Sequence, residues 1–160
     1  MSCKLIGMDS STAKTGISVY IDGRYIGASL IDTSKIKDTS EKFKQMCVGI
    51  ITKLNEEHPN IVVIERMHTL RNADTFRKLC KIMGIVQGWC IFNDCEYIEM
   101  SPTEWRKEVA SKDEKVPKKR DELKQWSVNK IKEKYNIEVK DDVADAICIG
   151  EAYINRFKGE

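Results

Sequence analysis

The sequence lacks several features that would assign it to a membrane or secreted class of protein. No apolar run approaches the length of a membrane span, and the N-terminus has neither the basic nor the apolar region of a signal peptide. Internal repeats, low-complexity tracts and a linker to a second domain are also missing. We therefore expect residues 1–160 to form a single cytoplasmic domain that can bury a proper core and needs no membrane partner.

The cysteines do not show the C-x-x-C spacing that is typical of zinc sites. The six residues are Cys3, Cys47, Cys80, Cys90, Cys95 and Cys148. Because most of them fall inside apolar periodic segments, we expect free, buried thiols in a reducing cytosol, in preference to disulfides or bound zinc.

The formal net charge is only +2, but the basic residues are concentrated in two segments. Residues 66–81 hold five basic and one acidic side chain, and residues 105–120 hold seven basic and three acidic ones. Clustered positive charge indicates an anionic partner more strongly than the overall balance does.

Three short strands are expected at the start of the chain. They are Lys4–Asp9, Gly16–Ile21 and Arg24–Ile31. The second and third are joined by Asp22-Gly23, a two-residue hairpin signal between apolar runs. We expect an antiparallel meander in which Asp9 closes the first strand.

Helices and two further strands alternate in the rest of the chain. The β-branched run Ile61–Ile64 is typical of a strand buried on both faces, and Glu65 follows it. Ser101–Glu104 is a capping box that starts a short helix. The other expected elements are helices over Thr39–Glu57, from a cap at Asp74 to Cys90, over Lys118–Tyr135 and from Asp141 onward, a strand over Glu96–Met100 and a loop over 110–120. This order predicts an α/β fold: a mixed five-stranded sheet, three antiparallel strands then two parallel ones, with helices on both faces.

The segment Asp141–Ile147 carries two carboxylates at helical spacing. Asp142 and Asp145 lie three residues apart, on one face of the helix that opens here. Taken alone, they suit N-terminal capping, because the helix dipole and the free N–H groups favour aspartate at this end.

Two acids upstream change that interpretation. Asp9 and Glu65 end the first and fourth strands, which can be parallel neighbours and so bring both side chains to one edge of the sheet. A helix packed across this edge would add Asp142 and Asp145. Burying four carboxylates without compensation is costly, so we expect a cation, and oxygen-only ligands favour magnesium or manganese over zinc. Two such ions roughly 4 Å apart are the usual apparatus for attack on a phosphodiester.

Three blocks of sequence combine these acids with characteristic neighbours. They are Gly7-Met8-Asp9-Ser10-Ser11-Thr12 with Thr15-Gly16, then Val63-Ile64-Glu65-Arg66, and finally Asp142-Val143-Ala144-Asp145-Ala146. In order and spacing the blocks closely resemble the RuvC-like Holliday junction resolvases of the RNase H-like superfamily. Asn72-Ala73-Asp74 is similar to the start of the same family's dimer helix. The resemblance covers essentially the whole chain, and the short length together with Lys118–Arg120 looks more like the phage-type members.

The resemblance implies an RNase H-like fold and a magnesium-dependent homodimeric endonuclease, with manganese able to substitute and no small-molecule cofactor. It implies paired nicks in four-way DNA junctions that leave 5′-phosphates and 3′-hydroxyls. Carried over residue by residue, Asp9, Glu65, Asp142 and Asp145 match the catalytic, metal-binding acids. Asp141 is a rival ligand, although the D-x-x-D-A spacing favours Asp142. A phage-encoded member would work in the cytoplasm of its host cell.

Basic residues near these acids are expected to bind DNA. The expected contacts are Arg66, His68, Arg71, Arg77, Arg106, Lys107, Lys118, Lys119 and Arg120. His68 stands about where bacterial members place an aromatic wedge, and it can either stack on a base or be an exposed loop residue. Any residue of Lys118–Arg120 could be the family's basic group near the scissile phosphate. Trp105 and Trp126 stand among basic residues, so that stacking on nucleic acid and burial in the core are both open.

The helix over 74–90 is apolar nearly all round and therefore needs two burial partners. One side carries Phe76, Leu79, Cys80, Met83 and Val86, and the other carries Ile82, Ile85 and Trp89 beside Gly84 and Gly88. The second side favours a dimer seam, although the glycines could instead ease the packing of this helix on the sheet.

Three other functions stay open. The turn over Asp9–Gly16 also resembles the phosphate loop of actin-like ATPases, but 160 residues hold only one of the two domains that these need. A protein that binds junctions without cutting them could use the acids as structural caps. A broader nuclease would cut forks and flaps as well as junctions.

Overall fold

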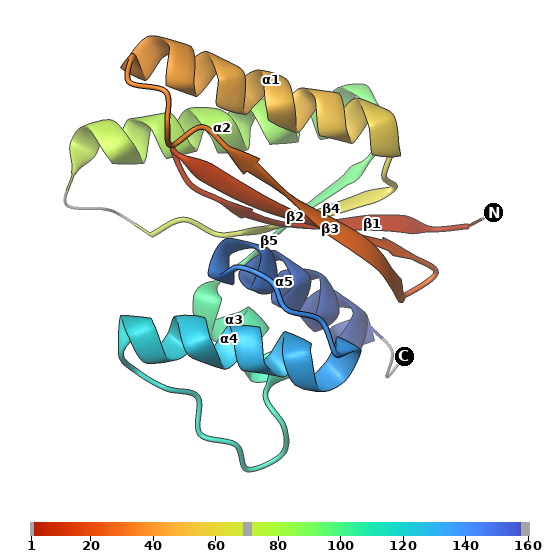
Figure 1. Cartoon of the computed structure of the whole chain (residues 1–160). Helices are drawn as coiled ribbons and strands as arrows, with labels where there is room; N and C mark the ends of the chain where they lie inside the picture. The colour runs from red at the N-terminus through yellow and green to blue at the C-terminus, as the bar shows by residue number, and fades with distance from the viewer. Residues whose placement is uncertain (1, 69–71, 158–160) are drawn as a thin grey trace.

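The computed structural model describes residues 2–68 and 72–157, and within them five strands form one mixed sheet that five helices cover on both faces (Figure 1). The elements are β1 (Lys4–Ser10), β2 (Lys14–Ile21), β3 (Arg24–Asp32), α1 (Thr39–Glu57), β4 (Ile61–Glu65), α2 (Ala73–Phe92), β5 (Glu96–Met100), α3 (Pro102–Val109), α4 (Arg120–Tyr135) and α5 (Asp141–Phe157). The strand order is β3-β2-β1-β4-β5, with β1 to β3 antiparallel and with β4 and β5 parallel to β1. The expected fold class is confirmed.

The turn between β2 and β3 uses the two residues that the sequence marks. Asp22 and Gly23 have φ angles of 50° and 73°, a region that glycine enters freely and aspartate tolerates. Such two-residue turns match the twist of the strands they join. Ser11 closes the preceding turn, because its hydroxyl donates to the carbonyl of Lys14 at 2.7 Å.

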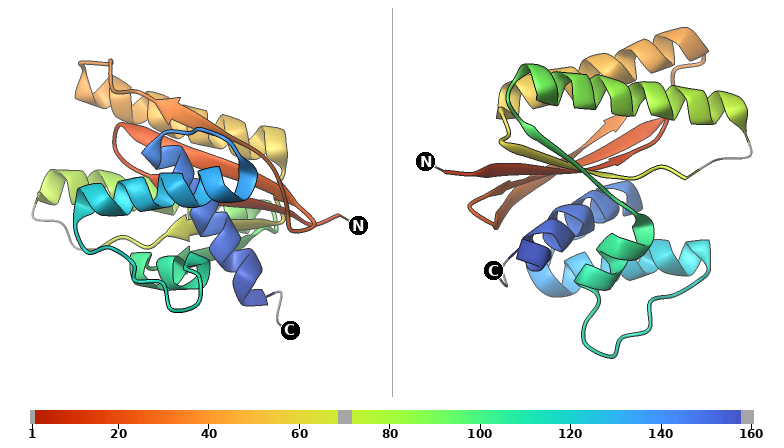
Figure 2. Two further views of the ribbon diagram at one scale, coloured as in Figure 1. Left: turned by 60° about the horizontal axis from the view of Figure 1, so that its bottom comes forward. Right: turned by 180° about the vertical axis from the view of Figure 1, so that it is seen from behind.

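Alternate side chains of the strands supply two separate cores. Ile6 and Met8 of β1 pack with α1 and α2, whereas Leu5 packs with α3, α4 and α5 on the other face. Successive residues of a strand point to opposite faces, so both faces of this sheet have to be covered. Figure 2 shows α1 and α2 as one layer and α3, α4 and α5 as the other. Trp105 and Trp126 are buried in the second core. Of the two roles considered for them, stacking on nucleic acid and packing in the core, the structure therefore shows the second.

Helix α5 crosses β1 and β2 at very short range. A Cβ added at Gly16 would lie 2.1 Å from the carbonyl oxygen of Asp142, and one at Gly7 would lie 2.5 Å from that of Ala146. Only glycine leaves room for the helix at these positions. Because Gly16 is the partner of Asp9 in the pairing of β1 with β2, the contact holds the start of α5 over the end of β1.

Two buried hydroxyl groups of β2 fix α5 in this position. Ser18 Oγ donates to the carbonyl of Ala146 at 2.8 Å, and the hydroxyl of Tyr20 donates to the carbonyl of Ile147 at 2.7 Å. Both donors are fully buried, so breaking either bond would leave a polar group without water to replace its partner.

The start of α2 differs from the expectation. Its cap is Asn72, whose side chain accepts from the amide of Thr75 at 3.0 Å, and the expected cap at Asp74 is wrong. Asp74 lies inside the first turn, where a carboxylate still interacts favourably with the helix dipole. Asn72 and Asp74, two residues apart, therefore have different roles, and the extended backbone conformation of Asn72 makes it the cap.

The expected second apolar face of α2 is only partly present, because two of its three large residues belong to the core and Ile85 is half-buried. Ile82 and Trp89 are buried in the same core as Leu79 and Val86, because α2 lies in the angle between the sheet and α1. Trp89 Nε1 donates to Asn55 of α1 at 2.7 Å. Most of the wide apolar arc is thus buried within one chain, and the exposed positions of α2 include Lys81, Gln87 and the two glycines Gly84 and Gly88.

The thiols are only partly as expected. Cys90, Cys95 and Cys148 are free and buried, but Cys3 and Cys80 are exposed and Cys47 is half-buried. Cys3 precedes β1, and Cys80 lies on the outward side of α2, so neither position has a core to enter. Among the described residues, no helix combines the length and the apolar character that crossing a membrane requires.

Replacing Gly16 with alanine should destabilise the fold, because the added Cβ meets backbone atoms of α5 that cannot rotate away. We expect the free energy of unfolding in urea to fall by about 1–3 kcal/mol, the usual cost of overpacking. Gly27→Ala is the matched control, since no atom lies within 4 Å of a Cβ added there on β3. Unchanged stability of Gly16→Ala would contradict the close contact between α5 and β2.

Candidate active site

Four carboxylates from three elements line one cavity of about 340 Å³. Asp9 stands near the end of β1 and Glu65 is the last residue of β4, and these strands are parallel neighbours. Asp142 and Asp145 come from the start of α5, which lies over the same edge of the sheet. The structure therefore brings together the four acids that the sequence singles out.

The cavity concentrates negative charge away from water. Burial raises the pKa of Asp9 well above its usual value, and repulsion from Glu65, Asp145, Asp142 and Asp141 raises it further. Burial is also the main reason that the pKa of Asp145 rises to about 6 and that the pKa of Glu65 is raised. A cluster of this kind is stabilised by a bound cation, which would favour the ionised form of each acid.

Asp141 also lines the cavity, but it is held differently. Its carboxylate accepts a hydrogen bond from Nζ of Lys124, which lowers the pKa of Asp141 and raises the pKa of Lys124. The charge of Asp141 is therefore already compensated within the protein. This favours Asp142 over its neighbour as a ligand, in agreement with the sequence spacing.

The first turn of α5 does not depend on the two aspartates for capping. The carbonyl of Lys140 accepts from the amides of Val143 and Ala144 and so begins the helix. The side chains of Asp142 and Asp145 line the cavity instead. The position of Asp142 and Asp145 in the cavity wall therefore supports a role in a functional site, and not the capping role that the two residues alone would suggest.

A buried indole orients Glu65. Trp105 Nε1 donates to Glu65 Oε2 at 2.7 Å, and this tryptophan is fully buried. The guanidinium carbon of Arg106 lies 4.6 Å from the centre of the same ring. Against the larger effect of burial, Arg106 lowers the pKa of both Glu65 and Asp145, so its charge acts directly on the acids.

Four basic side chains share the cavity with the acids, namely Arg106, Lys118, Arg120 and Lys124. Lys119 is exposed and pairs with Glu122 at 3.5 Å, and it is not part of the cavity wall. Of the three candidates for the basic group near the scissile phosphate, the two that line the cavity are therefore Lys118 and Arg120. Sequence reasoning missed Lys124, although it follows Arg120 by one turn of α4 and helical spacing could have revealed it.

Two expected DNA contacts lie just outside the cavity. Arg66 is exposed and forms ion pairs with Glu99 at 3.7 Å and Glu104 at 3.9 Å. His68 is exposed and lines a smaller pocket of about 170 Å³ that Glu65 also lines. Both residues follow β4 directly, so the strand that carries Glu65 positions them too.

The remaining expected contacts that the structure describes are not among the residues that line the cavity. Lys107 is exposed on α3. Arg77 is exposed on α2, where it pairs with Asp74 at 3.8 Å. Arg71 lies outside the described residues.

The chemistry of the donor set suits a hard divalent cation, because carboxylate oxygens are the ligands that magnesium and manganese prefer. Within residues 2–68 and 72–157, however, no three Asp, Glu, His or Cys side chains are grouped closely enough to hold an ion. Carboxylates that repel one another spread apart, and a cation would draw them together. The donor chemistry of the four acids therefore fits a divalent ion, but in their described positions no three of them coordinate one together.

Comparison with known families identifies the chain. The sequence model of the family described as "Crossover junction endodeoxyribonuclease RuvC" matches residues 5–151. The chain belongs to this family. The RuvC of Carboxydothermus hydrogenoformans is 29% identical over 154 residues, which cover 93% of this chain and 94% of that protein. The RuvC of Vibrio vulnificus is 31% identical over 84 residues, which cover 50% of this chain and 48% of that protein.

Solved structures share the fold at low sequence identity. RuvC of T. thermophilus in complex with a Holliday junction substrate superposes with a TM-score of 0.73 at 14% identity, over 98% of this chain and 96% of that one. The yeast mitochondrial Holliday junction resolvase Ydc2 gives a TM-score of 0.66 at 13% identity, over 96% and 78%. The expected RNase H-like fold and the expected enzyme class, a junction-resolving endodeoxyribonuclease, are confirmed. The likeness to phage-type members stays a prediction.

Trp105→Phe should weaken the binding of divalent cations, because it removes the N–H that orients Glu65 but keeps an aromatic ring in the core. Groups that orient metal-binding side chains typically contribute about ten- to hundredfold in affinity. Calorimetric titration with manganese would measure the change. Trp126→Phe is the matched control, since it removes a bond of equal length, 2.7 Å, from Trp126 Nε1 to Glu114, which is not part of the acid cavity. Equal losses of affinity in the two variants would contradict an orienting role for Trp105.

Without divalent cations, the stability of the protein should fall as the pH rises through about 6. The pKa of Asp145 is raised to about 6, chiefly by burial, whereas an aspartate in the unfolded chain has a value of about 3.9. The folded protein therefore retains a proton that the unfolded chain releases, and this difference favours unfolding as the pH increases. In the presence of a chelator, the melting temperature should drop between about pH 4 and about pH 7, and Asp145→Asn should reduce the drop.

Glu114→Gln is the control for this pH experiment, because the pKa of Glu114 is shifted in the opposite direction to that of Asp145. Burial opposes the shift, but hydrogen bonds from Lys130, the amide of Ser111 and Trp126 lower the pKa of Glu114 to about 2. The charge of Glu114 therefore stabilises the fold at neutral pH, and its loss should lower the melting temperature there. Equal pH profiles for the wild type and Asp145→Asn would contradict the raised pKa of Asp145.

Proposed function

We propose that this chain is a single nuclease domain that resolves four-way DNA junctions by paired nicks in the cytoplasm and depends on divalent metal. The observation that carries the proposal is that Asp9, Glu65, Asp142 and Asp145 meet in one cavity that basic side chains also line. Membership of the RuvC family supplies the substrate class. We expect magnesium to be the natural ion and manganese to replace it, without a small-molecule cofactor.

The side chains of the cavity divide the chemistry between them. The four acids would hold two ions, which when bound supply activation of water and stabilisation of the leaving oxygen. Arg106, Lys118, Arg120 and Lys124 would bind the phosphate oxygens of the strand and offset the repulsion between DNA and the acids. Trp105 keeps Glu65 oriented through its N–H. Cleavage at this site would leave 5′-phosphate and 3′-hydroxyl ends.

The exposed basic residues around the cavity would extend the contact along the DNA arms. Arg66 and Lys119 are exposed next to residues of the cavity wall in the chain, Lys107 is exposed on α3, and Arg77 is exposed on α2. Arg71 lies outside the described residues and is an expected contact from its sequence position alone. Such contacts reach phosphates, so they supply affinity and orientation but no reading of sequence. His68 stands close enough to Glu65 to stack on a base next to the site.

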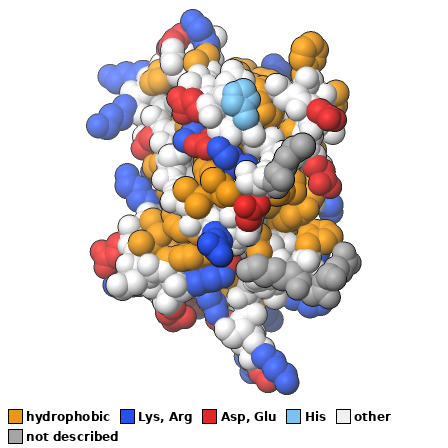
Figure 3. All heavy atoms as spheres, turned by 90° about the vertical axis from the view of Figure 1, so that its right-hand side faces the viewer, with side chains coloured by type: hydrophobic (Ala, Val, Ile, Leu, Met, Phe, Trp, Pro, Cys, Tyr) orange, Lys and Arg blue, Asp and Glu red, His pale blue; other side chains and the backbone are white. Residues whose placement is uncertain are grey.

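We further propose a homodimer joined through the outward side of α2. Gly84 and Gly88 are exposed there, and a Cβ added at either would meet no atom within 4 Å. At the end of the helix, Ile91 and Phe92 are 75% and 93% exposed, which is unusual for large apolar side chains. Figure 3 shows this end of the molecule, where apolar side chains reach the surface among charges of both signs. A two-fold axis beside α2 would give two sites for two cuts.

Gly88→Leu should weaken the dimer and uncouple the two nicks, because a bulky side chain would hold two α2 helices apart. Sedimentation at micromolar concentration would give the association state, and a junction with separately labelled strands would report each nick. Gly27→Leu is the control, since Gly27 also has open space but lies on β3. A monomeric wild type, or a fully dimeric Gly88→Leu, would contradict this interface.

The role of the acids is tested by Asp9→Asn and Glu65→Gln. Both variants should fold and bind junctions, because they remove negative charge that faces phosphate. Cleavage in magnesium should fall by a factor on the order of hundreds, as when a charged group is removed from a preorganised site. Asp94→Asn, in the exposed turn after α2, is the matched control and should cut normally. Near-normal cleavage by either active-site variant would refute the two-metal proposal.

A further inference from the structure

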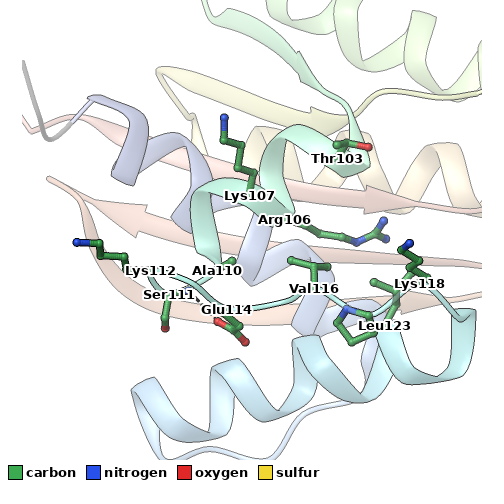
Figure 4. A pocket seen from close by; sticks show the side chains of 11 residues that line it. Thr103, Arg106, Lys107, Ala110, Ser111, Lys112, Glu114, Val116, Lys118 and Leu123 are labelled. Atoms are coloured by element: carbon green, nitrogen blue, oxygen red, sulfur yellow. Dashed lines mark hydrogen bonds between the residues drawn. The ribbon is translucent and has the colours of Figure 1, made fainter.

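A groove larger than the acid cavity lies beside it, between α3, the loop over 110–119 and the start of α4 (Figure 4). Its volume is about 790 Å³, against about 340 Å³ for the acid cavity. This value lies within the range of about 300–1,000 Å³ that is typical of pockets for small organic groups. The groove is thus large enough for a single nucleotide.

The groove and the acid cavity share a wall. Arg106, Lys118 and Leu123 line both of them. In Figure 4 the side chains of Arg106 and Lys118 point toward one another, whereas those of Lys107 and Lys112 point away. A DNA strand whose phosphate occupies the acid cavity would therefore pass between Arg106 and Lys118 to reach the groove.

Arg106 is held in place before any ligand arrives. Its guanidinium lies over the ring of Trp105, with 4.6 Å between the guanidinium carbon and the ring centre. Its Nε is buried and has no hydrogen-bond partner among the described residues. Buried donors are nearly always paired in folded proteins, so this guanidinium keeps unused capacity for an anionic oxygen.

The wall of the groove combines apolar surface with positive charge. Ala110, Val116 and Leu123 supply apolar side chains. Glu114, which also lines the groove, is engaged by Trp126 at 2.7 Å and by Lys130, so that its charge is compensated. An anionic phosphate with an attached flat base matches this combination, because a base can pack its face on apolar side chains while its phosphate meets the cations.

We propose that the groove binds one unpaired nucleotide of the cut strand, next to the scissile phosphate. Its phosphate lies between Arg106 and Lys118, and its base packs on Val116 and Leu123. The inference rests on the proposed endonuclease function, because the strand enters the groove from the acid cavity. It also gives a physical reason to prefer junctions, since a base near the exchange point leaves its pair at less cost than a base inside a duplex arm.

The test combines variants of the groove with junctions that lack a base. Val116→Trp fills the groove, and Val116→Ala is the matched variant that leaves it open. Each protein cuts junctions with an abasic site at either nucleotide flanking the cut or, as a control, well inside an arm. For the wild type, loss of the seated base should slow cleavage by about fivefold or more, the contribution typical of base stacking. Val116→Ala keeps the groove open and keeps Leu123 but loses part of the packing surface, so the same loss should slow it by a smaller factor. Val116→Trp should cut the intact junction slowly, and removal of the base should not slow its cleavage any further.

Equal sensitivity of Val116→Trp and the wild type to the missing base would overturn the proposal. A wild-type rate that is unaffected at both flanking positions would overturn it too.

A measurement on binding alone keeps the proposal testable if Val116→Trp fails to fold. In Asp9→Asn, which should bind without cutting, 2-aminopurine at a flanking nucleotide should change its fluorescence on binding more than the same probe within an arm. Equal signals from the two probes would contradict the groove. Failure of the endonuclease function would show separately, as an unmodified junction that the wild type leaves uncut.

Discussion

The close contact of α5 with β1 and β2 is the constraint on which the rest of the structure depends. At Gly7 and Gly16 no side chain separates the strand backbone from the helix backbone, and beside them the hydroxyls of Ser18 and Tyr20 donate hydrogen bonds to the helix carbonyls. Larger side chains at the two glycines would move α5 away and would separate its aspartates from the acids at the ends of β1 and β4. One packing contact therefore sets both the core on that face and the geometry of the site.

Bringing several carboxylates together in a buried cavity costs stability, and a role in metal and DNA binding explains why the protein has them there. Burial and mutual repulsion raise the pKa of Asp9 and of Asp145, so the carboxylates destabilise the fold when they are charged. Arg106 offsets part of that charge, and Lys124 compensates Asp141. Groups with strongly shifted pKa values in a cleft are typical of functional sites. A bound divalent cation would neutralise the remaining charge of the acids, and a DNA strand would neutralise that of the basic side chains.

The five strands and the meeting of the four acids at one edge of the sheet could be predicted from the sequence, because alternation, turn residues and helical spacing are local signals. The contacts that hold these elements and side chains in place could not be predicted from the sequence. Trp105 reaches Glu65 across 40 positions of the chain, and that bond depends on how α3 packs against the sheet. The burial of Trp89 likewise depends on α1 lying beside α2, which periodicity within one helix does not reveal. The groove was missed for the same reason, since its walls come from α3, a loop and α4.

Cleavage of a four-way junction, compared in magnesium with cleavage of a linear duplex of the same sequence, tests the central claim most directly. Mapping of the product ends completes the measurement, and forks and flaps show how narrow the substrate range is. We predict symmetric paired nicks in the junction, with 5′-phosphate and 3′-hydroxyl ends, and an uncut duplex. Junction binding without cleavage, or equal cleavage of junction and duplex, would contradict the claim.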